Sequence, residues 1–403
     1  MLSQLGKVFK KALTLYSRHG FWALVRETAK KMGLRPVRLS MQNIFDELKF
    51  VNLVKVSAKS NSAKLNTVNW YVPVVGRGSG GHGNIFRFIR ALEGFGVENR
   101  IILIGPGLPK TSQLAADQIT EWFFPLKAKV YRWGEEIPDA FVGMATEWRT
   151  AYYLRSSDKE ATRGYFIQDF EPWFFARGAH YALAEETYRF GFKGITAGSW
   201  LSDLVKKEYG MPALPIGFPA DFETYTKIHI EKPDNTMKVF FYARPPTPRR
   251  DFELGLLALQ DFISKRKNVV AVFAGWDLST YKIPFRHESY GVLDEKQLPE
   301  LYARTDLALV ISATNLSLLP VDLMASGVPI VSNRGPNVEW LLNDTNSYLC
   351  DLTVESISDT LSQAIDNPVE AQKKVERARL DISKLTWRSE AERAAKFLGL
   401  GIN

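Results

Sequence analysis

Short runs of apolar residues alternate with segments whose apolar positions recur every three or four residues. The short runs predict strands buried on both faces, and the helical spacing predicts helices that cover them. In the first series we expect strands near 67–75, 100–104, 140–144, 164–167 and 194–196, and a helix at 84–94 with Ile85, Phe88, Ile89 and Leu92 on one face.

A second series of the same kind begins after Pro233. Its predicted strands are 238–243, 269–274, 307–311 and 329–332, and its predicted helices are 251–265, 295–303, 318–326, 338–342, 354–365 and 388–398. Alternation of strands and helices is typical of parallel, doubly wound sheets. We therefore predict an α/β fold with two Rossmann-like lobes facing a cleft.

Residues 1–40 differ from the two series in charge and in pattern. They carry nine lysines and arginines and one acid, Glu27, whereas the other residues carry 43 basic and 43 acidic side chains. Helical spacing in 5–32 predicts amphipathic helices, which would suit an anionic membrane surface, packing on the body or dimerisation. Because the body is formally neutral, broad binding of nucleic acid is not favoured.

Cys350 is the sole cysteine, so an intrachain disulfide and cysteine zinc sites are excluded. No run of about 18 apolar residues predicts a membrane span. Lys10, Lys11 and Arg18 interrupt any signal-peptide core. We expect a cytoplasmic protein, with the inner face of the cell membrane as the place of any membrane contact.

A glycine-rich stretch, Gly76–Gly83, follows the first strand and fits the weak pattern GxGxxG. A dinucleotide site needs an acid at the end of the second strand, and Ile104 is followed there by Gly105, so NAD is rejected. Gly80 and Gly81 could still offer backbone N–H groups to a ligand, beside His82. The alternatives are a tight turn and a histidine that only bonds its own loop.

Two stretches of the second series carry candidate phosphate chemistry. Arg244 and Arg249 follow a strand, and arginine forks suit the paired oxygens of a diphosphate, although a solvated basic turn is the alternative. Further on, N–H groups of Ser317, Leu318 and Leu319 at a helix start could receive phosphate oxygens. Asp322, one turn further, could accept sugar hydroxyls or be an ordinary helical acid.

This second stretch resembles the nucleotide-sugar signature of the retaining GT-B glycosyltransferases, especially family 4. In that family two glutamates, separated by seven residues, precede Ala-Met-Ala-x-Gly-x-Pro. Asp322 matches the second acid and Leu-Met-Ala-Ser-Gly-Val-Pro the tail, whereas Thr314 replaces the first glutamate. The resemblance implies that Asp322 holds the ribose, that position 314 faces the donor sugar, and that Arg244 and Arg249 neutralise the diphosphate. Glu339 matches the family's Gly-Gly-x-x-Glu loop.

The stretch 165–174, Tyr-Phe-Ile-Gln-Asp-Phe-Glu-Pro-Trp-Phe, ends a strand of the first series. It is similar to a segment of bacterial rhamnan and O-antigen-type transferases. Asp169 and Glu171 are candidates for positioning an acceptor; a buried aromatic cluster with two satisfied acids is the alternative. The whole chain resembles the bacterial S-layer glycan rhamnosyltransferases, which implies dTDP-β-L-rhamnose as donor and a growing, lipid-linked glycan as acceptor.

No histidine cluster or DxD motif predicts a metal site, and nothing predicts a bound cofactor. We expect a metal-independent transferase in three parts: a helical extension at 1–60, an acceptor lobe at 61–222 with a return helix at 386–403, and a donor lobe at 223–385. A sugar-nucleotide epimerase and a non-catalytic, membrane-associated sugar-nucleotide-binding protein remain alternatives. The oligomeric state is open, a dimer included.

Overall fold

The computed structural model describes residues 48–52, 63–226 and 235–402. The chain forms two compact units, Met1–Leu53 and Val54–Asn403. In the first unit the described part is a short 3-10 helix, η1 (Lys49–Asn52). The predicted amphipathic helices, and the membrane contact and dimerisation considered for them, lie outside the described residues.

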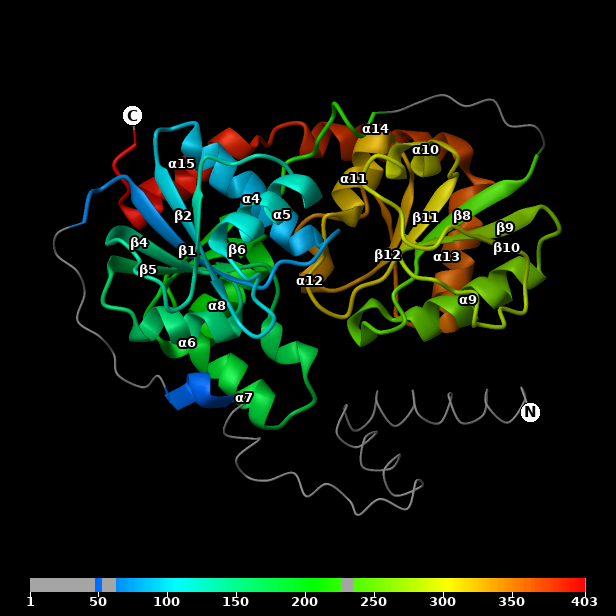
Figure 1. The fold of residues 1–403 in the computed structure, drawn as a ribbon. Helices are drawn as coiled ribbons and strands as arrows, with labels where there is room; N and C mark the ends of the chain where they lie inside the picture. The colour runs from blue at the N-terminus through cyan, green and yellow to red at the C-terminus, as the bar shows by residue number, and fades with distance from the viewer. Residues whose placement is uncertain (1–47, 53–62, 227–234, 403) are drawn as a thin grey trace, which may run out of the picture. The chain divides into compact units, whose positions relative to one another are not determined.

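The first sheet of the larger unit is parallel, with strand order β3-β2-β1-β4-β5-β6-β7 (Figure 1). Its strands are β1 (Thr67–Pro73), β2 (Glu98–Ile104), β3 (Lys129–Arg132), β4 (Ala140–Ala145), β5 (Glu160–Ile167), β6 (Lys193–Ala197) and β7 (Ala213–Ile216). The helices between them are α4 (Gly80–Glu93), α5 (Ser112–Trp122), α6 (Trp148–Ser156), η2 (Glu171–Phe174), α7 (Ala179–Glu186), η3 (Thr187–Arg189) and α8 (Ser199–Tyr209).

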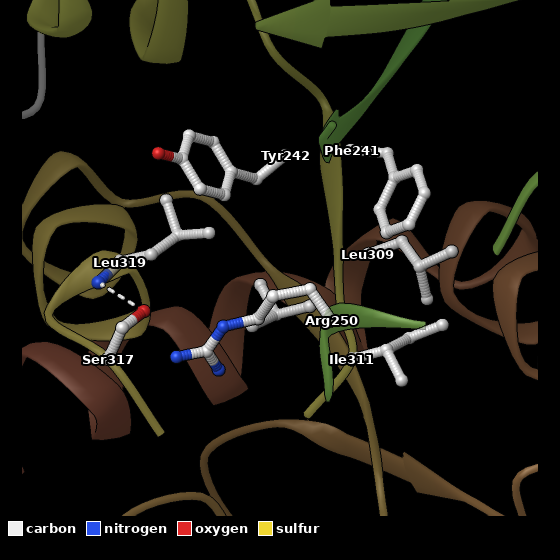
Figure 2. A pocket seen from close by; sticks show the side chains of 8 residues that line it. Phe241, Tyr242, Arg250, Leu309, Ile311, Ser317 and Leu319 are labelled. Carbon is white, nitrogen blue, oxygen red and sulfur yellow. Dashed lines mark hydrogen bonds between the residues drawn. The ribbon is translucent and has the colours of Figure 1, made fainter. Parts of the chain in front are cut away.

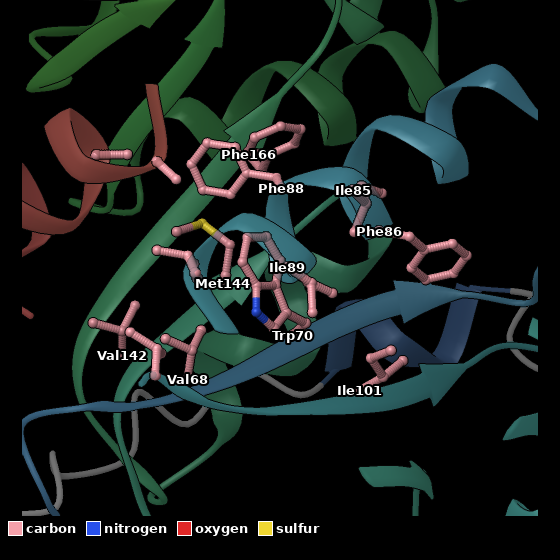
Figure 3. Close-up of a cluster of buried hydrophobic side chains, with 14 of the residues drawn as sticks. Val68, Trp70, Ile85, Phe86, Phe88, Ile89, Ile101, Val142, Met144 and Phe166 are labelled. Carbon is pink, nitrogen blue, oxygen red and sulfur yellow. The ribbon is translucent and has the colours of Figure 1, made fainter. Parts of the chain in front are cut away.

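Alternate residues of β1 enter two separate cores, because successive side chains of a strand point to opposite faces. Trp70 packs with α4 and with α15 (Trp387–Leu398), the last helix of the chain (Figure 3). Tyr71 packs on the other face with α6 and α8. The last helix therefore returns to the first sheet.

The second sheet is also parallel, with strand order β10-β9-β8-β11-β12-β13. Its strands are β8 (Met237–Tyr242), β9 (Val269–Ala274), β10 (His287–Ser289), β11 (Leu307–Val310), β12 (Ile330–Asn333) and β13 (Tyr348–Cys350). Its helices are η4 (Pro248–Arg250), α9 (Phe252–Ser264), α10 (Leu298–Ala303), α11 (Leu319–Ser326), α12 (Pro336–Glu339), α13 (Val354–Asp366) and α14 (Pro368–Ile382). Helices α11 and α14 cover one face, and α9 and α13 the other.

The predicted α/β fold with two doubly wound parallel sheets is confirmed. Several boundaries moved. Helix α4 begins at Gly80 rather than at 84, because the Ser79 hydroxyl caps it by accepting from the His82 N–H, and helix α12 spans Pro336–Glu339 rather than 338–342. Strands β3, β7, β10 and β13 and helix α14 were not predicted. Among the described residues, no helix has both the length and the apolar character that crossing a membrane requires.

Candidate functional site

The predicted arginine loop lies between β8 and α9, at the carboxyl edge of the second sheet. It tightens into η4, which ends at Asp251, the one non-glycine residue with positive φ (48°) in the part of the chain that the structure describes. Arg244 donates to the Gly275 carbonyl at 3.3 Å. Arg250 lies deeper, and its Nη1 donates to Ser312 Oγ at 2.6 Å and to the Asn315 carbonyl at 3.3 Å.

A pocket opens beside Arg250, between the end of β8, strand β11 and the start of α11 (Figure 2). Its lining consists of Phe241, Tyr242, Arg250, Leu309, Val310, Ile311, Ser317 and Leu319. Figure 2 shows the guanidinium of Arg250 on the Ser317 side of this pocket. The Ser317 hydroxyl accepts from the Leu319 N–H at 3.4 Å. A partly buried cation therefore lies next to the start of a helix, an arrangement that favours an anion.

Asp169, at the end of β5, joins the first sheet to this region. Thr314 Oγ1 donates to Asp169 Oδ2 at 2.8 Å, and the Asn315 N–H donates to Oδ1 at 2.9 Å. Arg249 Nε lies 3.6 Å from Oδ2. The Asn315 side chain also donates to the Gln168 and Ala197 carbonyls at 3.0 and 2.8 Å. The loop after β11 is thus fixed by the carboxyl ends of β5 and β6.

Burial has the largest influence on the pKa of Asp169, which is only 8% exposed. Desolvation raises the pKa of Asp169. The rise is opposed by the charge of Arg250, by the hydrogen bonds from Asn315 and Thr314, and by the charge of Arg249. Desolvation also lowers the pKa of Arg249 and of Arg250, with Asp169 as the largest opposing charge for each. The carboxylate and the two guanidiniums therefore form one coupled group.

The glycine loop lies beside Asp169, through the neighbouring Gln168. Gln168 Nε2 donates to the Gly81 carbonyl at 3.0 Å, and Asn84 donates to Gln168 Oε1 at 2.9 Å. Gly80 and Gly81 are exposed. The His82 ring is held by Ser79 Oγ, 2.9 Å from Nδ1, and burial lowers its pKa. His82 therefore stays neutral at physiological pH and bonds its own loop.

The surroundings of Glu171 differ from those expected of a residue that positions an acceptor. Its Oε2 accepts from the Trp148 N–H at 2.6 Å and from the Tyr165 hydroxyl at 3.1 Å, inside the first lobe. Desolvation and the nearby charge of Glu147 raise its pKa well above the ordinary value. The role of Glu171 in positioning an acceptor is therefore corrected: its carboxyl group is buried, and it supports the fold below η2.

Asp322 occupies the first turn of α11, but its electrostatic neighbours differ from those of the arginines. Burial raises the pKa of Asp322 well above the ordinary value; the charge of Arg87 opposes this, and Glu295 and Asp221 add to it. Arg87 of α4 forms an ion pair with Glu295. Arg244, Arg249 and Asp322 were predicted to converge on one ligand. In the structure the charged neighbours of Asp322 are those of a second cluster, next to the cluster of the arginines.

The predicted loop at 335–339 adjoins the loop after β11. Asn337 Nδ2 donates to the carbonyls of Ser312 and Thr314 at 2.9 and 2.6 Å. The Glu339 side chain instead closes its own turn, accepting from the Gly335 N–H at 2.9 Å. Thr314 is buried and already bonded to Asp169. The site residues that sequence reasoning missed are Arg250, Asn315 and Gln168; the tandem Arg249-Arg250 was the available signal.

Within the described residues, no three His, Cys, Asp or Glu side chains are grouped as metal ligands.

The second lobe matches a protein-family model, WsaF C-terminal domain, over residues 237–362. An O-antigen biosynthesis protein RfbC from Myxococcus xanthus is 30% identical over 355 residues, which are 85% of this chain and 28% of that protein. The chain thus spans just over a quarter of the length of this relative.

Solved glycosyltransferase structures share the fold at low identity. Sucrose-phosphate synthase from Thermosynechococcus elongatus superposes with a TM-score of 0.64 at 10% identity, covering 82% of this chain and 98% of that one. Anabaena HepE in complex with UDP and glucose has a TM-score of 0.63 at 13% identity, covering 82% and 99%. A glycosyltransferase from Rickettsia africae has a TM-score of 0.62 at 11% identity, covering 84% and 98%. Together these comparisons support the resemblance drawn from the sequence, a GT-B glycosyltransferase, and the chain has the two-lobed α/β fold of that group.

Proposed function

We propose that this chain is a glycosyltransferase that moves a sugar from a nucleoside diphosphate onto a growing bacterial surface glycan. The observation that carries the proposal is the position of Arg250, partly buried beside the start of α11 and bonded to the loop after β11. A diphosphate at the Ser317 side of this pocket would meet the Arg250 guanidinium and the start of α11 together. The O-antigen relative supports a surface glycan as the product.

In the proposed reaction the bond between the sugar's anomeric carbon and the diphosphate oxygen breaks. A bond from an acceptor hydroxyl oxygen to that carbon forms, the hydroxyl proton passes to the leaving diphosphate oxygen, and the nucleoside diphosphate leaves. Negative charge grows on the leaving oxygen, so cations fixed near it lower the barrier. In this proposal Arg250 and Arg249 supply these cations, and their orientation by Ser312, Asn315 and Asp169 supports the role.

The finer assignments form part of the same proposal: dTDP-β-L-rhamnose as donor, a lipid-linked glycan as acceptor, retention of configuration, and work at the cytoplasmic face of the membrane. They are supported by the resemblance of residues 165–174 to rhamnan-building transferases, and of residues 314–329 to the nucleotide-sugar signature of the retaining GT-B glycosyltransferases. Of the solved neighbours, HepE was crystallised with UDP-glucose, so uridine donors belong among the candidates.

The test incubates the purified chain with dTDP-rhamnose, UDP-glucose and a GDP-sugar, each with and without a synthetic rhamnosyl oligosaccharide, and measures the released nucleoside diphosphate. We expect release that depends on the acceptor, and a product lengthened by one sugar. Equal release without an acceptor would instead favour the epimerase alternative. Tight donor binding with no release from any donor would favour the non-catalytic one.

A further inference from the structure

Three aromatic side chains form a group at the end of the first sheet, here called the aromatic surface: Trp173 and Phe174 of η2, and Trp200 of α8. Trp173 is 44% exposed and Phe174 is 39% exposed, whereas Trp200 is partly buried. The ring centroids of Trp173 and Trp200 lie 5.6 Å apart, with their planes inclined by 37°. Adjacent, exposed large aromatic rings mark a binding site more often than a lone exposed ring does.

The backbone beneath the aromatic surface is fixed. Phe170, which is buried, stacks on Tyr188 with ring centroids 5.4 Å apart and contacts Trp173 edge-on at 5.2 Å. Glu171 anchors η2 through the Trp148 N–H and the Tyr165 hydroxyl. The network that corrects the sequence-based role of Glu171 therefore holds the two exposed rings in place, which limits the entropy that a ligand must supply to order them.

The aromatic surface is continuous with the candidate donor site. The guanidinium carbon of Arg249 lies 4.1 Å from the centre of the Phe174 ring, and Arg249 Nε lies 3.6 Å from Asp169. Phe174 is thus the shared boundary between the arginines and the two tryptophans. A ligand lying along Trp173 and Trp200 would have one end next to Arg249.

The polar neighbours favour a carbohydrate over an anionic headgroup. Ser199 and Asp203, both exposed, flank Trp200 on α8, and a side chain three residues further along a helix lies on the same face. A hydroxyl and a carboxylate can accept the hydroxyl hydrogens of a sugar, whereas the carboxylate repels phosphate. The flat rings cover the apolar C–H faces of sugar rings.

We infer that the aromatic surface is the binding site for the acceptor glycan, holding sugar rings that precede the one whose hydroxyl reacts. The inference rests on the proposed function and deepens it, because it makes an oligosaccharide, rather than a single sugar or a lipid phosphate, the recognised part of the acceptor. Longer acceptors gain contacts with Trp173 and Trp200 that a monosaccharide does not reach.

The test measures transfer to synthetic oligorhamnosides of one to four sugars, by the wild type, Trp173→Ala, Trp200→Ala and a control, Tyr290→Ala, whose exposed ring lies near β10 in the other lobe. For the longer acceptors we expect each tryptophan variant to raise KM about tenfold, with kcat within about twofold of wild type, since a tenfold change corresponds to the loss of one good contact. Trp173→Phe should restore most of the affinity, and Tyr290→Ala should match wild type.

If the wild type is active and KM is unchanged in Trp173→Ala and Trp200→Ala, the aromatic surface is not the acceptor site. That result would not affect the proposed transferase activity. Binding of the oligorhamnosides, followed by saturation-transfer NMR without donor, gives a reading even if no donor supports turnover. Nucleotide binding by each variant should equal that of wild type, which shows that the fold is intact. Co-sedimentation with phosphatidylglycerol vesicles should not change; a loss confined to the tryptophan variants would instead assign the surface to lipid and overturn the inference.

Discussion

The two lobes present opposite kinds of surface to the candidate site. The second lobe offers cations and helix amides: Arg249, Arg250 and the start of α11 around a small pocket. The first lobe offers two carboxylates, Asp169 and Asp203, and a group of aromatic rings. Cations suit a diphosphate, and rings with acids suit a sugar, so the division of residue types matches a division of labour between donor and acceptor.

Asp169 and Glu171 sharpen this comparison, because they are two residues apart and have opposite surroundings. Asp169 accepts hydrogen bonds from Thr314 and Asn315 of the other lobe. Glu171 is the first residue of η2, where the chain turns, and accepts only from Trp148 and Tyr165 of its own lobe. Equal substitutions at the two positions should therefore have different consequences.

The largest expected effect is on the cationic side. Arg250→Ala removes the partly buried charge beside the start of α11 and should lower kcat about 100- to 1,000-fold, as losing one preorganised donor to a developing negative charge does. Arg250→Lys should recover only part, because one ammonium cannot reproduce the fork. The control Arg377→Ala, which removes an exposed guanidinium paired with Asp381 on α14, should keep wild-type rates in the same assay.

The second effect is on Asp169. Asp169→Asn keeps the shape but weakens the hold on Arg249 and on the loop that begins α11, and should lower kcat about 10- to 100-fold through misplacement of the arginine. Because burial raises the pKa of Asp169 and the ionised form orients Arg249, wild-type kcat should rise with pH through that raised pKa. If kcat of the asparagine variant rose with pH in the same way as that of the wild type, this role would be contradicted.

Glu171→Gln should show the reverse behaviour, with near wild-type kcat and altered stability. The amide oxygen can still accept from Trp148 and Tyr165. The pKa of Glu171 is raised in the folded state, so the folded protein binds more protons than the unfolded one, and the free energy of unfolding falls as pH rises through the raised pKa. The slope is at most about 1.4 kcal/mol per pH unit. Urea titrations across the pH range should show a flatter dependence in the variant than in wild type.

The smallest effect concerns the ion pair between Arg87 and Glu295, beside Asp322. The Glu295 side chain is 55% exposed, so Arg87→Ala should cost less than about 1 kcal/mol of unfolding free energy and the cost should shrink at high salt. Thermal unfolding at two salt concentrations measures it. A loss of several kcal/mol would mean that this contact, rather than the Asp169 cluster, holds the two lobes together.

The sequence was informative where a strand is buried on both faces. Strands β1, β8 and β9 consist mostly of apolar residues and were predicted to within two residues. The missed strands β3, β7, β10 and β13 are short strands at the edges of the two sheets, so no run or alternation distinguished them. Helix α14 starts at a proline and carries charges around most of its surface.

The same contrast holds in the candidate site. Arg244, Arg249 and Ser317 were predicted as candidates because their loops follow strands, and open parallel sheets bind ligands at that edge. Which way Glu171 points depends on whether the chain turns into η2 or stays extended after β5, and residue types alone do not decide that. The pairing of Thr314 and Asn315 with Asp169 joins positions 145 and 146 residues apart, which no local pattern predicts.

The most direct measurement is a crystal structure of the chain soaked with a nucleoside diphosphate. We expect the diphosphate at Arg250, its oxygens within hydrogen-bonding distance of the guanidinium and of the amides at 317–319, where α11 starts. Diphosphate bound only at the glycine loop 76–83, or on the exposed arginines of the surface, would contradict this expectation.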